Sequence, residues 1–126
     1  MISDGQRKRF DLEDRTFEFA KSVRAFVRRL PRTICNQEDV RQLARSSGSV
    51  GANYIEANSA LGRKDFVMRI RIARKEAKET TYWLRLLDTQ GSEELEVGRD
   101  QLVQESVELM KIFGAILKKS LPAEKV

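Results

Sequence analysis

The chain has 126 residues and a net charge of +5, and its length fits one globular domain. Its content of 40% apolar and 34% charged residues is too hydrophobic for a disordered protein. It contains no histidine and one cysteine, Cys35, which excludes an internal disulfide, histidine-based catalysis and the usual zinc sites. No apolar run approaches the ~20 residues that cross a bilayer, and the first ten residues lack the apolar core of a signal peptide, so we expect a cytoplasmic protein without a membrane partner.

Apolar side chains recur at steps of three and four along most of the chain, which is typical of helices that bury one face. The pattern predicts helices at about residues 12–30, 38–61, 64–88 and 99–120. Pro31 ends the first, because its ring cannot continue a helix. We expect Asn36 to cap the second helix, whose apolar stripe runs through Ile55 to Leu61, and Gly62 to end it in a left-handed conformation.

The last two helices complete the predicted fold. In the third helix we expect Met68 and Leu86 at one edge of the buried arc. Ser92 is a candidate cap for the fourth helix, which begins between Ser92 and Asp100. The sequence shows neither an alternating strand pattern nor an internal repeat. It therefore predicts an all-α protein, a single antiparallel up-down four-helix bundle over residues 1–126.

The segment 45–57, RSSGSVGANYIEA, is rich in small residues that a loop, a phosphate-binding turn or a packed helix would all use. A phosphate-binding P-loop is excluded because no Gly-Lys-Ser/Thr follows. The apolar period of the second helix runs through the segment, so we expect a helix there. Its glycines and serines cost about 3 kcal/mol in helix propensity relative to alanine, which close packing of neighbouring backbones must recover.

A second stripe on this helix, opposite the apolar one, consists of polar and small residues. It consists of Gln42, Arg45, Ser49, Asn53, Glu56 and Ala60. The third helix carries polar residues within its apolar arc that can meet this stripe, and these are Arg69, Glu76, Glu79 and Thr80. An enclosed carboxylate without a partner costs several kcal/mol, so Glu76 and Glu79 are expected to meet Arg45, Arg69 or Asn53.

The polar stripe of the second helix and the four polar residues of the third helix are together called the polar seam. Two interpretations of this polar seam remain open. The glutamates are either a catalytic carboxylate pair or part of a network that fixes register within or between subunits. We favour the network, because the sequence offers no histidine, metal-binding motif or activated nucleophile. We therefore predict no catalytic residue, no metal site and no cofactor.

Positive charge is segregated along the chain. The third helix carries a basic arc without any acid, which consists of Lys64, Arg71, Arg74, Lys75, Lys78 and Arg85. The first helix has a similar stripe, Lys21, Arg24, Arg28 and Arg32, while acidic residues concentrate in the fourth helix and the loop before it. Such segregation is typical of proteins that bind a phosphate backbone, and it would equally suit an acidic protein surface. Because aromatic residues are scarce, we expect recognition by shape and charge.

Residues 41–87 closely resemble the bacterial family of four-helix bundle proteins, whose members include the S23-type protein encoded by intervening sequences in some 23S ribosomal RNA genes. The resemblance is carried by Gln42, Arg45 and Ser49, by the Asn-x-x-Glu of Asn53 and Glu56, by the RKDF of 63–66 and by Glu79. It covers most of residues 10–120. Many members have a proline and a glycine around the Asn-x-x-Glu, where this chain has Gly51 and Ala57, so the bend of the second helix is expected to differ.

The resemblance implies a ring-like homo-oligomer, with a pentamer favoured. A relative is the accessory protein of diversity-generating retroelements, a basic pentameric barrel that works with reverse transcriptase and nucleic acid. The family has no established enzymatic activity to transfer.

Four functions follow in order of preference. The first is a non-enzymatic oligomer that binds nucleic acid, RNA in preference, and the second is an adaptor that docks an acidic partner surface such as that of a nucleic-acid enzyme. The third is a helix-turn-helix repressor, which requires a break near residues 48–51. The last is an enzyme that uses Glu56 or Glu79.

Overall fold

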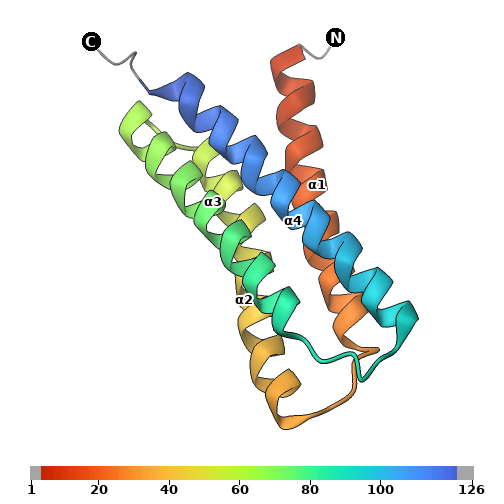
Figure 1. Cartoon of the computed structure of the whole chain (residues 1–126). Coiled ribbons are helices and arrows are strands. Elements are labelled where there is room, and N and C mark those ends of the chain that lie inside the picture. The colour runs from red at the N-terminus through yellow and green to blue at the C-terminus, as the bar shows by residue number, and fades with distance from the viewer. Residues whose placement is uncertain (1–3, 122–126) are drawn as a thin grey trace, which may run out of the picture.

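The computed structural model describes the backbone of residues 4–121 and the side chains of residues 11–121. It contains four helices, α1 (Asp4–Val27), α2 (Ile34–Asn58), α3 (Arg63–Leu86) and α4 (Glu93–Ser120). Figure 1 shows that the chain reverses direction at each of the three connections. The predicted all-α four-helix bundle is confirmed. None of the helices in residues 4–121 is long and apolar enough to span a bilayer.

The helices are arranged so that each has two neighbours. α2 packs against α1 and α3, and α4 packs against α3 and α1. Within the described residues, α1 and α3 do not pack against each other and so occupy opposite corners of the bundle. Charged residues on α1 and on α3 therefore belong to different corners, which matters for the basic surfaces described below.

The core is built from the apolar stripe of each helix. Its fully buried side chains include Val23, Leu43, Ile70, Leu109 and Phe113, which come from all four helices. Burying a side chain of this size stabilises the fold by about 1.5–3 kcal/mol relative to leaving it in water. These contacts place α2 and α3 in fixed register, which positions the polar residues between them.

The small residues of α2 allow α1 to approach closely. α2 runs without a break through residues 45–57, so the helix prediction for this segment is confirmed and the helix-turn-helix alternative is wrong. A Cβ at residue 51 would lie 2.8 Å from Thr16 Oγ1 and 3.1 Å from Thr16 Cβ, so only a glycine fits without displacing α1. On the neighbouring face of α2, Ser46 and Ser47 are fully buried.

The ends of α1 differ from the prediction. The helix begins at Asp4 rather than near residue 12, and it ends at Val27 rather than at Leu30. The next three residues form a tighter turn, in which Leu30 N donates to Val27 O at 3.2 Å. Proline disfavours helical geometry in the residue before it, so the helix ends ahead of Pro31.

Both predicted caps of α2 are wrong. The N-cap is Thr33, whose hydroxyl accepts a hydrogen bond from the Asn36 amide at 3.0 Å, and Asn36 lies inside the first turn. The helix ends at Asn58, three residues before the predicted end. Gly62 has an extended backbone with φ −151° and is the N-cap of α3, so it does not end α2 in a left-handed conformation.

α4 begins at Glu93, which lies inside the expected interval from Ser92 to Asp100 and six residues before the range 99–120. Ser92 is its N-cap, as expected, and its hydroxyl accepts from the Leu95 amide at 3.3 Å. The turn before it requires positive φ at two residues, Gln90 and Gly91, with φ of 52° and 78°. The glycine reaches this conformation without steric cost.

Four apolar side chains that the pattern placed in the core are exposed. Met68 and Leu86 on α3 are 47% and 48% exposed, and Ile55 on α2 is 48% exposed. Leu61 lies outside the helix and is fully exposed. Val67, next to Met68 on α3, is buried although the pattern did not place it in the core, so the buried arc of α3 is shifted around the helix relative to the prediction.

Candidate nucleic-acid interface and interhelical polar cluster

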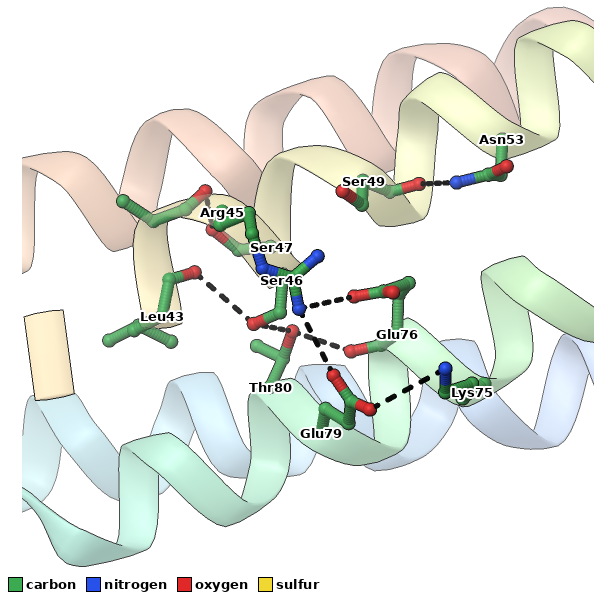
Figure 2. A network of polar contacts seen from close by, with 11 residues as sticks. Leu43, Arg45, Ser46, Ser47, Ser49, Asn53, Lys75, Glu76, Glu79 and Thr80 are labelled. Atoms are coloured by element: carbon green, nitrogen blue, oxygen red, sulfur yellow. Dashed lines mark hydrogen bonds and ion pairs between the residues drawn. The ribbon is translucent and has the colours of Figure 1, made fainter. Parts of the chain in front are cut away.

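A cluster of charged side chains joins α2 to α3 (Figure 2). Arg45 Nη2 lies 3.5 Å from Glu76 Oε2 and 3.2 Å from Glu79 Oε2. Lys75 Nζ lies 3.9 Å from the other carboxylate oxygen of Glu79. Of the three partners expected for the glutamates, Arg45, Arg69 and Asn53, it is Arg45 that meets both, and the contact takes place within one chain.

Glu76 is the buried member of this cluster. Its side chain is 8% exposed, whereas that of Arg45 is 54% exposed. Within the described part of the chain, Glu76 Oε2 has no hydrogen-bond partner, and the ion pair with Arg45 is too long to be one. Burying a carboxylate without a countercharge destabilises the folded state, so Arg45 is the group that offsets the burial of Glu76.

Hydroxyl groups fill the space beneath the ion pairs. Thr80 Oγ1 lies 2.9 Å from Ser46 Oγ and 2.7 Å from the carbonyl oxygen of Glu76. Ser46 Oγ in turn donates to the carbonyl oxygen of Leu43 at 3.3 Å. Thr80 and Ser46 are fully buried, and their hydroxyls are satisfied by these contacts. The pair links α2 to α3 at a single register, which supports the structural interpretation of the seam.

The remainder of the predicted seam is only partly joined to α3. Asn53 Nδ2 donates to Ser49 O at 2.9 Å, and Asn53 Oδ1 accepts from Arg69 Nη1 at 3.2 Å. Gln42 and Glu56 are exposed and have no partner within residues 11–121, and Ala60 lies beyond the end of α2. A role of this outer part of the seam between subunits stays a prediction.

The basic arc of α3 is exposed along its whole length. Its six side chains are Lys64, Arg71, Arg74, Lys75, Lys78 and Arg85. Of these, only Lys75 has an ion-pair partner in the described part of the chain, at the 3.9 Å distance to Glu79. The Arg74 guanidinium extends toward α4, where Nε lies 3.7 Å from the position of a Cβ at Gly114. The arc is therefore a solvent-facing row of cations whose charge the protein itself leaves largely uncompensated.

The basic stripe of α1 borders a different groove. Arg24 Nη2 donates to Ala44 O of α2 at 3.4 Å and lies beside Gly48, and Lys21 Nζ lies 5.6 Å from the ring centroid of Phe17. Both residues line the groove between α1 and α2. Because α1 and α3 occupy opposite corners, the basic arc of α3 and the basic stripe of α1 form two separate surfaces.

The acidic residues of α4 are used within the bundle. Arg15 Nε and Nη2 donate to the two carboxylate oxygens of Glu105 at 2.8 and 2.7 Å, and Arg29 pairs with Glu94. The hydrogen bond to Glu105 raises the pKa of the Arg15 guanidinium above its ordinary value. α4 thus compensates Arg15 of α1 and Arg29 of the turn that follows α1, whereas the arc on α3 receives no such partner from it.

Arg41 was not part of any basic surface predicted from the sequence, yet it lines one cavity with Arg28 and Arg32 of the predicted basic stripe, at the corner between α1 and α2. Arg28 and Arg41 lie on either side of a chain reversal, so no helical spacing relates them. In residues 11–121 no three Cys, Asp or Glu side chains are grouped as metal ligands would be.

Comparison with known proteins places the chain in a family. A family model described as 23S rRNA-intervening sequence protein matches residues 8–119. The fold is similar to the crystal structure of a protein with unknown function from the S23 ribosomal protein family of Bacteroides thetaiotaomicron VPI-5482, with a TM-score of 0.72 and 32% sequence identity, covering 88% of this chain and 98% of that one. No curated protein matches the sequence. The resemblance carried by residues 41–87 is thereby confirmed, and the chain belongs to the 23S rRNA-intervening sequence protein family.

Proposed function

We propose that this protein is a non-enzymatic, oligomeric helical bundle that binds nucleic acid, RNA in preference, through the basic arc of α3. The observation that carries the proposal is the row of exposed cations on α3 that lack acidic partners within residues 11–121, apart from Lys75. The family name links its members to 23S ribosomal RNA genes, which favours RNA over DNA. The exposed free thiol of Cys35 fits a reducing compartment such as the cytoplasm.

The physical basis of binding is the release of counterions from the phosphate backbone. A protein that neutralises several phosphates loses affinity steeply as salt rises, with a log–log slope of about −0.7 to −0.9 per phosphate contact. The arc has six cations, and one of them, Lys75, forms an ion pair with Glu79. With few exposed aromatic side chains near the arc to stack on bases, we expect little dependence on base sequence.

We also propose that the chain assembles into a homo-oligomer, with a pentamer favoured. Exposed apolar side chains on α2 and α3, including Ile55 and Met68, support a contact with a second copy. A light-scattering mass of five times the 14.5 kDa chain is expected, and a mass of one chain at all concentrations contradicts this part of the proposal.

A second candidate function is an adaptor that docks an acidic surface, such as that of a nucleic-acid enzyme. The arc is accompanied by exposed apolar side chains, among them Tyr82 at 59% and Leu86 at 48% exposure. A surface groove of about 790 Å³ with Met68, Ile72 and Leu121 in its wall adjoins Arg71. Mixed apolar and basic surfaces suit protein partners, so a pull-down that survives nuclease treatment favours this alternative.

The test is fluorescence anisotropy with a labelled RNA at ~50 mM salt, where electrostatic binding is strongest. The charge-reversal variant Arg71→Glu, Arg74→Glu, Lys78→Glu is expected to abolish binding. Its matched control reverses three exposed lysines of α4 instead, as Lys111→Glu, Lys118→Glu and Lys119→Glu. The proposal fails if the wild-type protein ignores RNA and DNA, or if both variants lose affinity equally.

A further inference from the structure

A cavity of about 500 Å³ lies at the corner where α1 turns into α2. Three arginines, Arg28, Arg32 and Arg41, line it together with apolar side chains that include Val27 and Val40. No acidic side chain is among its lining residues. The corner lies on the α1–α2 side of the bundle, so it is separate from the arc on α3.

The distribution of unpaired arginines singles out this corner. Among the side chains of residues 11–121, most arginines have an ion-pair or hydrogen-bond partner, as Arg15, Arg45 and Arg69 do. Those without one fall in two places only, the basic arc of α3 and this cavity. The three arginines at the cavity are exposed and have no acidic partner within residues 11–121, so they concentrate positive charge that favours a bound anion.

The corner is also held rigidly. Asn36 Nδ2 donates to the carbonyl oxygens of Pro31 and Asp88, both at 2.9 Å, and Asn36 Oδ1 accepts from the Asp88 amide at 2.9 Å. Asn36 is 2% exposed and forms part of the cavity wall. A cavity whose backbone is fixed in this way loses little conformational entropy when it binds a ligand.

The lining combines two kinds of chemistry. Planar guanidinium groups bind phosphate oxygens in pairs, which the three arginines can supply from both sides of the turn. The wall formed by Val27, Pro31 and Val40 is apolar and can contact the face of a planar ring. A ligand that carries a phosphate next to an aromatic ring satisfies both parts, which neither an inorganic anion nor an apolar peptide does.

We propose that this corner binds a nucleoside phosphate, either free or as the terminal nucleotide of a strand. The phosphate contacts Arg28, Arg32 and Arg41, and the base packs on the apolar wall. The site deepens the proposed nucleic-acid function, and it uses residues that the arc does not. Nucleotide binding at the corner and RNA binding by the arc can therefore be tested, and can fail, independently of each other.

The test uses the full-length protein labelled with nitrogen-15 and titrated with uridine monophosphate, uridine or inorganic phosphate. The nucleotide is expected to shift the Nε–H signals of the three corner arginines and the side-chain amide signal of Gln37 in a saturable manner. Uridine and inorganic phosphate are each expected to bind about tenfold more weakly or worse, because each engages only half of the site. Absence of these shifts at millimolar nucleotide overturns the proposal.

Variants then locate the site. Arg32→Gln with Arg41→Gln is expected to weaken nucleotide binding at least about tenfold, whereas Lys118→Gln with Lys119→Gln leaves it unchanged. If the corner variant binds the nucleotide as tightly as wild type does, the proposal is wrong. The arc variant Arg71→Glu, Arg74→Glu, Lys78→Glu distinguishes RNA binding by the arc from nucleotide binding at the corner. It is expected to lose RNA binding and to keep nucleotide binding. Loss of nucleotide binding in the arc variant while the corner variant retains it contradicts the corner site.

Two oligonucleotides distinguish the sources of the ligand. An RNA with a 5′-phosphate that binds more tightly than the same RNA with a 5′-hydroxyl shows that the corner takes the end of a strand. Equal affinities, with binding of uridine monophosphate retained, show that it takes a free nucleotide. Either result supports the proposal if the difference between wild type and the corner variant persists.

Discussion

Asn36 and Asp88 join the two connections at one end of the bundle. The carboxamide of Asn36 donates to Asp88 O and accepts from Asp88 N, with both distances 2.9 Å. The same carboxamide donates to Pro31 O, so one side chain links the α1–α2 turn to the end of α3. An amide side chain is required here, because the site needs two donated hydrogen bonds and one accepted bond.

The first prediction concerns this link. Asn36→Ala leaves backbone groups of Pro31 and Asp88 unpaired at a nearly buried position, and we expect it to lower the free energy of unfolding by about 2–3 kcal/mol. Urea denaturation at a fixed protein concentration measures the change. The exposed neighbour Gln37 provides the control, and Gln37→Ala is expected to change stability by less than about 0.5 kcal/mol. Equal effects of the two substitutions would contradict the account.

The second prediction compares two glycines of α2. Alanine is the better helix former by about 1 kcal/mol, so Gly48→Ala is expected to stabilise, since its Cβ would meet only the mobile end of Arg24 at 3.3 Å. Gly51→Ala is expected to destabilise by about 1–2 kcal/mol, because its Cβ would lie 2.8 Å from Thr16 Oγ1 and force α1 away. Thermal unfolding of both variants gives the signs, and a stabilised Gly51→Ala would show that α1 does not approach α2 this closely.

The third prediction is a double-mutant cycle on Arg45 and Glu76. Arg45→Met leaves the buried Glu76 without its countercharge and is expected to cost about 1–2 kcal/mol, less than for a fully buried pair because Arg45 is 54% exposed. Adding Glu76→Gln removes the buried charge and is expected to restore most of the loss. Denaturant unfolding of the four proteins gives the coupling energy. Strictly additive effects would mean that the ion pair does not form.

The fourth prediction concerns the bidentate pair between Arg15 and Glu105. Their side chains are 42% and 30% exposed, so Glu105→Gln is expected to cost about 0.5–1 kcal/mol at low salt. Because salt screens exposed charges, the cost should shrink near 1 M salt, where the Debye length is about 3 Å. Unfolding measured at both salt concentrations checks this, and a loss that does not change with salt would indicate that packing rather than charge is responsible.

The sequence predicts the four helices because their apolar periodicity is strong, but it does not identify the ends that tertiary contacts decide. Thr33 and Asn36 are both able to cap α2. The choice falls on Thr33 because the carboxamide of Asn36 is engaged with Asp88, which lies 52 residues away. Similarly, Met68 fits the apolar pattern of α3, yet it is exposed because the neighbouring helices cover an arc that includes Val67 and leaves out Met68.

The candidate sites were predictable to different degrees. The cost of a buried carboxylate predicted that Glu76 meets Arg45, Arg69 or Asn53, but only the helix register selects Arg45 among these three. The corner that brings Arg28 and Arg41 to one cavity could not be predicted from the sequence, because the chain reversal between them leaves no periodic signal. The division of the cations into two surfaces likewise depends on which helices are neighbours.

Whether the arc of α3 binds nucleic acid is decided by the salt dependence of RNA affinity. The dissociation constant is measured between ~50 and ~200 mM salt for wild type and for Arg71→Gln, Arg74→Gln, Lys78→Gln. We expect the variant to bind more weakly and the log–log slope to fall in magnitude by about 2, since three phosphate contacts at about 0.7 each are lost. An unchanged affinity and slope in the variant would contradict binding by the arc.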